Sequence, residues 1–169
     1  IETYIYSVIT MLNKDQQAAL ETVQQQHNIF LTGSPGTGKS YVLKEIIRWL
    51  KSSGKKYAVT SSTGCSAILI NGQTIHSYLG MGVGTRTVDN IVTGLRKMKG
   101  KYDAINSLQV LVLDEISMID NNTLEKVSLI LQRIKKNDKP FGGIQIIFVG
   151  DFCQLSPVQG HYCFTSDAW

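Results

Sequence analysis

One stretch of the chain combines closely spaced glycines with a lysine and a hydroxyl side chain. It runs Gly33-Ser34-Pro35-Gly36-Thr37-Gly38-Lys39-Ser40. A glycine, four residues and then Gly-Lys-Ser is the pattern of a loop that binds phosphates through converging backbone N–H groups. We expect Lys39 to reach the β- and γ-phosphates and the Ser40 hydroxyl to bind Mg²⁺. The stretch therefore predicts a nucleoside triphosphate site.

The segments on either side of this loop support that prediction. Residues 28–32 read as a short buried strand that leads into the loop. One face of the helix expected after it carries the apolar residues Val42, Leu43, Ile46, Ile47 and Leu50. The N-terminus of such a helix directs the positive end of its dipole at the phosphates. A glycine turn without a ligand is the alternative, but it does not explain why a strand, the Gly-Lys-Ser loop and an amphipathic helix follow one another in this order.

Two further apolar runs end in polar side chains. Residues 109–113 are followed by Asp114 and Glu115, and residues 144–149 run into a segment that contains Gln154. Continuous apolar runs are typical of parallel strands that are buried on both faces. Strands and helices alternate along the chain, so the fold class we expect is α/β, a three-layer sandwich with a mainly parallel central sheet.

In such sheets the ligand lies beyond the carboxyl ends of the strands, which brings these polar residues to the same edge as Lys39. Asp114 is suited to hold the Mg²⁺ that Ser40 engages. Glu115 could act as the general base that polarises the attacking water, although a helix cap is the alternative for the pair. Gln154 could sense the γ-phosphate or help to orient the water.

Three other parts of the chain contain polar residues or glycines that could have either a structural or a functional role. Gln16 can form a capping box with Asn13, or its amide can pair with the edge of adenine. Thr63 and Gly64 lie in a strand-to-helix junction that could hold a phosphodiester, although a plain helix cap at Ser62 or Thr63 is the simpler alternative. His76 has no second ligand at metal spacing, so we do not expect a metal there.

Two more helices are expected in the second half of the sequence. One covers residues 88–98 and has the basic residues Arg96, Lys97, Lys99 and Lys101 at its end, usually the sign of a solvated helix terminus. The other covers residues 123–136, and Asn122 with Glu125 forms the expected capping box.

The composition suits one intracellular domain. The chain has 169 residues, 43% of them hydrophobic, and a net charge of +4, which permits an anionic partner without requiring one. Its three cysteines lack metal-ligand spacing, and we expect free thiols in a reducing compartment: nucleus, mitochondrion or cytoplasm. No apolar run approaches the ~20 residues that span a bilayer, so we expect no membrane association. The two ends read as cuts in a longer protein, with residues 1–12 as a lead-in segment.

Three classes of protein use such a loop. A small-molecule phosphoryl transferase rarely needs a water-activating glutamate, and a nucleotide-dependent switch or scaffold hydrolyses ATP poorly. A motor ATPase needs hydrolysis coupled to a track. Glu115 and Gln154 favour the motor.

Six segments, taken in order, also resemble a known family. They are residues 12–16, 33–40, 63–67, 74–77, Asp114-Glu115-Ile116-Ser117-Met118 and Gly150-Asp151-Phe152-Cys153-Gln154-Leu155. Together they resemble the petite-integration-frequency (Pif-type) helicases, superfamily-one DNA motors that move 5′ to 3′. The resemblance spans residues 12–158 and covers the first RecA-like lobe of a P-loop NTPase. Two departures are Asn13 in place of the usual serine and Ser156 where a proline is common.

The resemblance implies ATP and Mg²⁺ as cofactors, with Gln16 reading adenine and Gln154 sensing the γ-phosphate. It implies that Asp114 is a metal ligand, that Glu115 is the catalytic base, and that Thr63, Gly64 and His76 lie in segments that touch single-stranded DNA. The implied partners are single-stranded DNA, duplex junctions and a second helicase lobe, which carries the arginine finger in this family and lies outside these residues. DNA replication, recombination and repair are the implied settings.

The reading we adopt is the N-terminal motor lobe of an ATP-dependent DNA helicase. The alternatives are a RecD-like helicase or conjugative motor, and an ATP-binding module that is inactive on its own.

Overall fold

A parallel β-sheet forms the centre of the molecule. The computed structural model describes residues 12–82, 86–158 and 160–169, and within these residues five strands form one sheet in the order β1-β5-β4-β2-β3. All four strand pairs are parallel. The strands are β1 (Ile29–Leu31), β2 (Tyr57–Ser61), β3 (Gln73–Thr74), β4 (Val110–Asp114) and β5 (Gln145–Val149). The expected α/β fold with a parallel sheet is confirmed.

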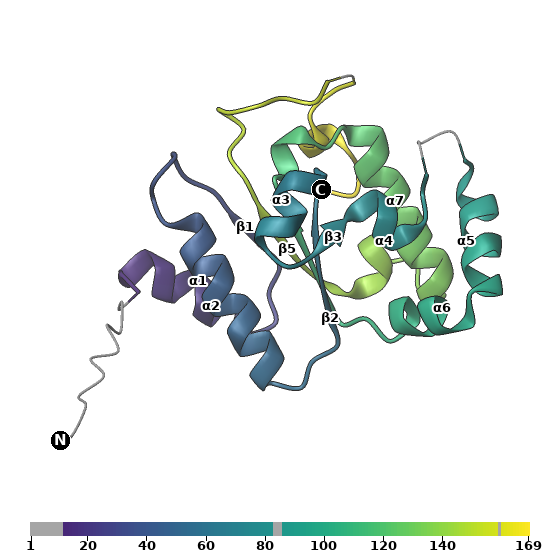
Figure 1. Ribbon diagram of the computed structural model, residues 1–169, viewed down its shortest axis with the longest axis horizontal. Helices are drawn as coiled ribbons and strands as arrows, with labels where there is room; N and C mark the ends of the chain where they lie inside the picture. The colour runs from purple at the N-terminus through teal and green to yellow at the C-terminus, as the bar shows by residue number, and fades with distance from the viewer. Residues whose placement is uncertain (1–11, 83–85, 159) are drawn as a thin grey trace.

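Helices connect the strands and cover both faces of the sheet (Figure 1). They are α1 (Lys14–Gln24), α2 (Lys39–Ser52), α3 (Gly64–Leu69), α4 (Ile75–Leu79), α5 (Val88–Lys97), α6 (Lys99–Asn106) and α7 (Asn121–Lys135). Short 3₁₀ turns occupy Ile116–Met118, Pro140–Gly143 and Cys163–Thr165. Within the described residues no helix is both long and apolar enough to cross a bilayer.

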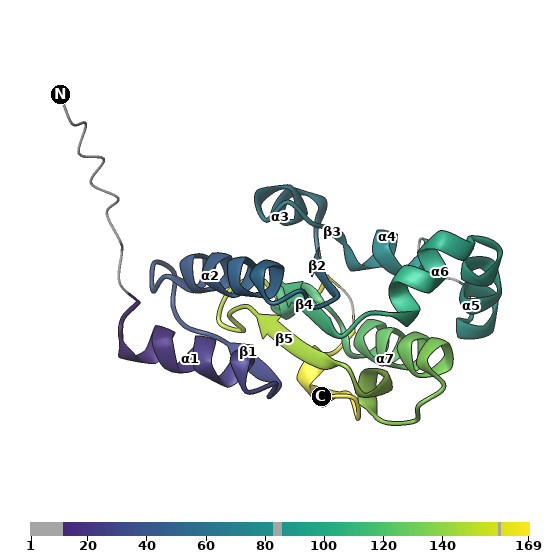
Figure 2. The same ribbon diagram turned by 90° about the horizontal axis from the view of Figure 1, so that it is seen from below.

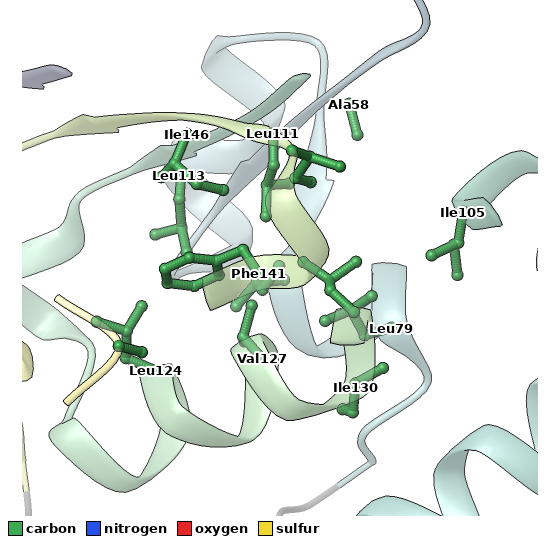
Figure 3. Close-up of a cluster of buried hydrophobic side chains, with 14 of the residues drawn as sticks. Ala58, Leu79, Ile105, Leu111, Leu113, Leu124, Val127, Ile130, Phe141 and Ile146 are labelled. Atoms are coloured by element: carbon green, nitrogen blue, oxygen red, sulfur yellow. The ribbon is translucent and has the colours of Figure 1, made fainter. Parts of the chain in front are cut away.

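The side chains of β4 alternate between two hydrophobic clusters, which explains its continuous apolar run. Val110 and Val112 pack with α1 and α2 on one face of the sheet. Leu111 and Leu113 pack with helices α4 to α7 on the other (Figure 3). The two groups of helices lie on opposite sides of the sheet in both views (Figure 2). A strand buried on both faces cannot shift its register by one residue without exchanging the two sets of side chains.

Helix α7 begins earlier than expected, and the predicted capping box of Asn122 and Glu125 is wrong. The N-cap is Asp120, whose carboxylate accepts from the Thr123 N–H at 2.9 Å and from the Thr123 hydroxyl at 2.6 Å. Glu125 instead accepts from the Ser166 hydroxyl at 2.7 Å. Of three adjacent polar residues that could cap the helix, the carboxylate was the stronger acceptor.

The basic cluster expected at the end of one helix lies at the junction of two. Helix α5 ends at Lys97, and α6 begins at Lys99. Sequence reasoning missed α6 because Gly100 in its first turn is a poor helix former. The ammonium of Lys101 donates to the Ser77 carbonyl at 2.7 Å and so ties α6 to α4.

The three cysteines are unpaired, and the structure describes only the end of the N-terminal segment. Cys65 and Cys153 are exposed, Cys163 is buried, and all three are free thiols as expected. Of the expected lead-in segment, residues 1–11 lie outside the described residues, and Leu12 packs against the cluster beneath α1 and α2.

Candidate nucleotide site

The glycine-rich loop connects the end of β1 to the first turn of α2. Gly38 has φ +89°, a left-handed conformation that favours glycine. A Cβ at this position would also lie 2.6 Å from the side-chain nitrogen of Gln16. The loop is closed from within by the Thr37 hydroxyl, which donates to the Ser34 carbonyl at 2.8 Å. The backbone turn therefore favours glycine at position 38, and a larger residue there would also displace the Gln16 side chain.

The ammonium of Lys39 lies over the mouth of this loop. It donates to the carbonyls of Gly33 and Ser34, the latter at 3.2 Å. A cavity of about 430 Å³ opens beside it and is lined by Asn13, Asp15, Gln16, Leu31, Thr32, Gly33, Thr37, Lys39 and Val42. The predicted phosphate-binding lysine and the loop backbone thus line one hollow large enough for a small ligand.

Gln16 connects the start of α1 to this loop. Its side-chain oxygen accepts from the Asn13 N–H at 3.0 Å, while the Asn13 side chain accepts from the Gln16 N–H at 2.9 Å. The capping-box interpretation is therefore confirmed. The amide nitrogen donates to the Thr37 carbonyl at 3.3 Å. One N–H and one lone pair of the amide remain, and these could pair with adenine, which stays a prediction.

Asp114 is the last residue of β4 and Glu115 follows it, at the carboxyl edge of the sheet as expected. Burial raises the pKa of Asp114 to about 6, and the positive charge of Lys39 acts weakly in the opposite direction. Glu115 has φ +54° and ψ +44°, a left-handed conformation that is uncommon for a residue with a side chain. Strained backbone of this kind concentrates at functional sites.

Gln154 lies in a turn that follows β5, the strand beside β4. Gly150 lets this turn pass close to the residue after Glu115, since a Cβ at Gly150 would lie 2.9 Å from the Ile116 side chain. Asp151 is 7% exposed, and its carboxylate accepts from the Gln154 amide at 2.9 Å. This hydrogen bond is the main cause that lowers the pKa of Asp151, and the charge of Lys39 acts in the same direction.

Sequence reasoning did not single out Asp151 as a site residue. The signal was present, because an acidic residue comes just after the apolar run of β5, and Asp114 likewise comes directly after the apolar residues of β4. β1, β5 and β4 are parallel neighbours in the sheet. The loop after β1, the turn after β5 and the end of β4 therefore bring Lys39, Asp151 and Asp114 to one edge of the sheet, although the three residues are far apart in the sequence.

The residues present fit a Mg²⁺ ion bound together with phosphates. Ser40 is exposed at the second position of α2, and Asp114 supplies a carboxylate whose burial a cation would offset. Among the described residues no group of three or more His, Cys, Asp or Glu could hold a metal. Mg²⁺ commonly uses one or two protein oxygens and completes its shell with phosphate and water.

Thr63, Gly64 and His76 lie beyond the carboxyl ends of β2 and β3. Thr63 is the N-cap of α3, and its hydroxyl accepts from the Ser66 N–H at 3.2 Å, which confirms the cap. Gly64 is exposed, and a Cβ there would meet nothing within 4 Å. His76 is half-buried in α4, and its carbonyl accepts from the Met81 N–H. Their contact with DNA stays a prediction.

Comparison with known sequences identifies the family. The profile of the PIF1-like helicases matches residues 11–162. The chain belongs to the PIF1-like helicase family. It is 42% identical over 172 residues to the ATP-dependent DNA helicase RRM3 of Saccharomyces cerevisiae, an alignment that covers 96% of this chain and 24% of RRM3. The chain thus spans about a quarter of the length of that relative.

Solved structures of PIF1-like helicases share the fold. The Pif1 helicase of Candida albicans superposes with a TM-score of 0.90 at 40% identity, over 94% of this chain and 37% of that one. A Pif1 helicase from Bacteroides in complex with ADP-AlF3 and single-stranded DNA superposes with a TM-score of 0.79 at 29% identity, over 93% of this chain and 39% of that one. The RecA-like fold expected from the resemblance is therefore confirmed.

Proposed function

We propose that this chain is the ATP-hydrolysing N-terminal motor lobe of an ATP-dependent DNA helicase that translocates on single-stranded DNA and unwinds duplexes. One observation carries the proposal: Lys39 and the backbone of the phosphate-binding loop line one hollow of about 430 Å³, which Gln16 also borders. A lysine beside converging loop backbone, at the sheet edge where β4 ends in Asp114, suits a metal-bound triphosphate. Membership in the PIF1-like family supports the same activity.

In this proposal each residue at the edge of the sheet has a separate role. Lys39 and the loop N–H groups hold the β- and γ-phosphates. Ser40 and Asp114 would hold Mg²⁺, which would supply positive charge to the phosphates. Glu115 takes a proton from the attacking water. Gln154 contacts that water or the γ-phosphate through its side-chain amide.

The DNA track is proposed to pass the ends of β2 and β3. Thr63 caps α3 and Gly64 is its first residue. Gly64 is exposed and the fold has room for a side chain there, so the glycine leaves space for a phosphodiester backbone. His76 lies one strand further along. The crystal structure of the Bacteroides relative in complex with single-stranded DNA supports this class of partner. Duplex junctions and a second helicase lobe are the further partners we propose, and the lobe would supply the arginine finger.

We also propose an intracellular, reducing location, which three unpaired thiols support. Cell fractionation that recovers the protein only from a secreted fraction would contradict it.

The test of ATP hydrolysis compares Lys39→Ala with Lys44→Ala in the longer protein that contains this chain. Lys44 is exposed on the same helix, so its replacement removes an equal charge away from the loop. We expect steady-state turnover with single-stranded DNA to fall by at least about 100-fold in Lys39→Ala, and to change little in Lys44→Ala. Unimpaired turnover in Lys39→Ala would overturn the assignment of the loop.

The test of the DNA track is the salt dependence of binding. The logarithm of the affinity for single-stranded DNA is expected to fall with the logarithm of the salt concentration, with a slope of about −0.7 for each phosphate neutralised. His76→Ala is expected to weaken DNA binding. Salt-independent binding, or full affinity in His76→Ala, would contradict the proposed track.

A further inference from the structure

Asp151 anchors the turn that carries Gln154 through three hydrogen bonds. One carboxylate oxygen accepts from the Cys153 N–H at 2.9 Å, and the other accepts from the Gln154 side-chain nitrogen at 2.9 Å. The Asp151 carbonyl accepts from the Gln154 N–H at 3.0 Å. Gln154 itself is exposed. The buried Asp151 carboxylate therefore holds the side chain of an otherwise exposed glutamine, and the Asp151 carbonyl holds the backbone of the same glutamine.

This contact determines which way the Gln154 amide faces. An ionised carboxylate can only accept hydrogen bonds, so the amide group turned toward it must be the nitrogen. The lowered pKa of Asp151, caused mainly by the hydrogen bond from Gln154, keeps the carboxyl ionised at neutral pH. With its nitrogen held by Asp151, the amide directs its oxygen away from the anchor.

The anchored turn is packed against the segment that carries Glu115. Gly150 precedes Asp151, and a Cβ there would lie 3.1 Å from the Ile116 backbone nitrogen. On the other side the ring of Phe152 packs against that of Phe30, with centroids 5.3 Å apart. The turn is thus fixed between the strand that leads to the phosphate loop and the residue after Glu115.

We infer that Asp151 is the positioning residue that orients Gln154, so that the amide oxygen accepts a hydrogen bond from the water that attacks ATP. The inference rests on the proposed function. In the reaction the water oxygen bonds to the γ-phosphorus, the bond to the ADP oxygen breaks, and Glu115 receives the proton. Gln154 supplies an acceptor that aligns the water, and Asp151 prevents the amide from turning around.

The test uses Asp151→Asn, Gln154→Ala and the double variant in the longer protein. Asn at position 151 can still accept from Cys153, but its own amide nitrogen would favour an inverted Gln154. We expect a 10- to 100-fold loss of turnover, as outer-shell partners of a site commonly give, with ADP affinity unchanged and ADP-aluminium fluoride affinity reduced. The double variant should be no slower than the slower single variant.

Two controls separate this inference from the proposed function and from misfolding. Asp138→Asn removes the same charge at an exposed position and is expected to retain full turnover. Asp151→Asn combined with Gln154→Glu should regain turnover relative to Gln154→Glu alone, because the new amide can donate to the new carboxylate and leave an oxygen outward. Turnover that disappears in Lys39→Ala but persists in Asp151→Asn would overturn the inference alone. The inference would also be overturned if the losses of turnover in Asp151→Asn and Gln154→Ala multiplied in their double variant. It would be overturned as well if Asp151→Asn gave Gln154→Glu no gain in turnover.

Discussion

The Ser62 N–H donates to the Asp114 carbonyl at 3.2 Å, and this bond joins the proposed nucleotide site to the proposed DNA track. A chain of hydroxyl groups runs beside it. The Ser61 hydroxyl lies 3.3 Å from the same carbonyl and donates to the Ser66 hydroxyl at 2.8 Å. The Ser66 hydroxyl in turn contacts that of Thr63. The Ser62 N–H bond and the adjacent hydroxyl groups therefore connect the end of β4, where the proposed metal ligand Asp114 lies, to the cap of α3.

Replacing Ser66 with Ala is the first prediction, because it interrupts this set between Ser61 and Thr63. Losing one hydroxyl bond should cost about 1 kcal/mol of stability. We expect ATP turnover to respond less to single-stranded DNA, measured as the ratio of rates with and without DNA. Ser107→Ala, which removes a hydroxyl bond to Ala104 at the end of α6, is the matched control. An unchanged ratio in Ser66→Ala would show that the hydroxyl chain does not couple the sites.

Gly64→Ala separates folding from DNA binding. The added methyl group meets nothing within 4 Å, and Gly64 has no positive φ, so the fold tolerates it. Alanine at the first position of α3 should raise the free energy of unfolding by up to about 1 kcal/mol. If a phosphodiester passes this surface, affinity for single-stranded DNA should nevertheless fall. Fluorescence anisotropy and urea denaturation measure the two effects, and undiminished DNA affinity would place the track elsewhere.

Sequence reasoning predicted the strands and the loop at this edge of the sheet because they depend on local patterns. The glycine spacing predicted the loop, and a strand buried on both faces predicted Asp114 at the sheet edge. Tertiary contacts carried the rest. The position of Asp151 after an apolar strand could be read from the sequence, but its hydrogen bond with the Gln154 side chain could not. Asp120 and not Asn122 is the N-cap of α7, so Glu125 forms no capping box. Glu125 instead accepts a hydrogen bond from Ser166, which lies 41 residues further along the chain.

Glu115→Gly should make the protein more stable and less active. The left-handed backbone at Glu115 costs roughly 1 kcal/mol for a residue with a Cβ, and glycine relieves it. Turnover should fall by about 10²–10⁴-fold because the general base is lost. Glu115→Gln should lose the same activity without the gain in stability. Gln26→Gly, at an exposed residue with φ +66°, should gain stability and keep its activity. A Glu115→Gly variant that is less stable than the wild type would contradict backbone strain at this residue.

Asp114→Asn should alter the pH dependence of stability. Burial raises the pKa of Asp114 to about 6, above the ~3.9 of an unfolded chain. Between about pH 4 and 6 the folded state therefore binds a proton that the unfolded state lacks, so this group lowers stability as the pH rises. The nucleotide-free variant should be more stable than the wild type at pH 8, and the difference should shrink toward pH 4. Urea denaturation from pH 4 to 8 tests this, with the exposed Asp138→Asn as control. A difference that does not vary with pH would contradict the raised pKa.

The arginines of the chain predict that residues 1–169 alone hydrolyse ATP very slowly. Arg48 pairs with Glu45, and Arg133 lies 3.7 Å from Asp89. Arg86 donates to the Gly80 carbonyl, and Arg96 is exposed on α5. Among the described residues no recorded contact joins these four side chains to the phosphate loop. An arginine finger contributes ~10³–10⁵ in rate where it has been measured.

Residues 1–169 should therefore bind nucleotide weakly and leave duplex DNA intact, and adding single-stranded DNA should barely raise the turnover. The measurement is steady-state ATP hydrolysis by purified residues 1–169, beside the longer protein assayed at equal concentration. Lys39→Ala in both chains reports any contaminating ATPase. DNA-stimulated turnover near ~10 s⁻¹, an ordinary enzyme rate, would show that the finger lies within these residues and that the proposed division into two lobes is wrong.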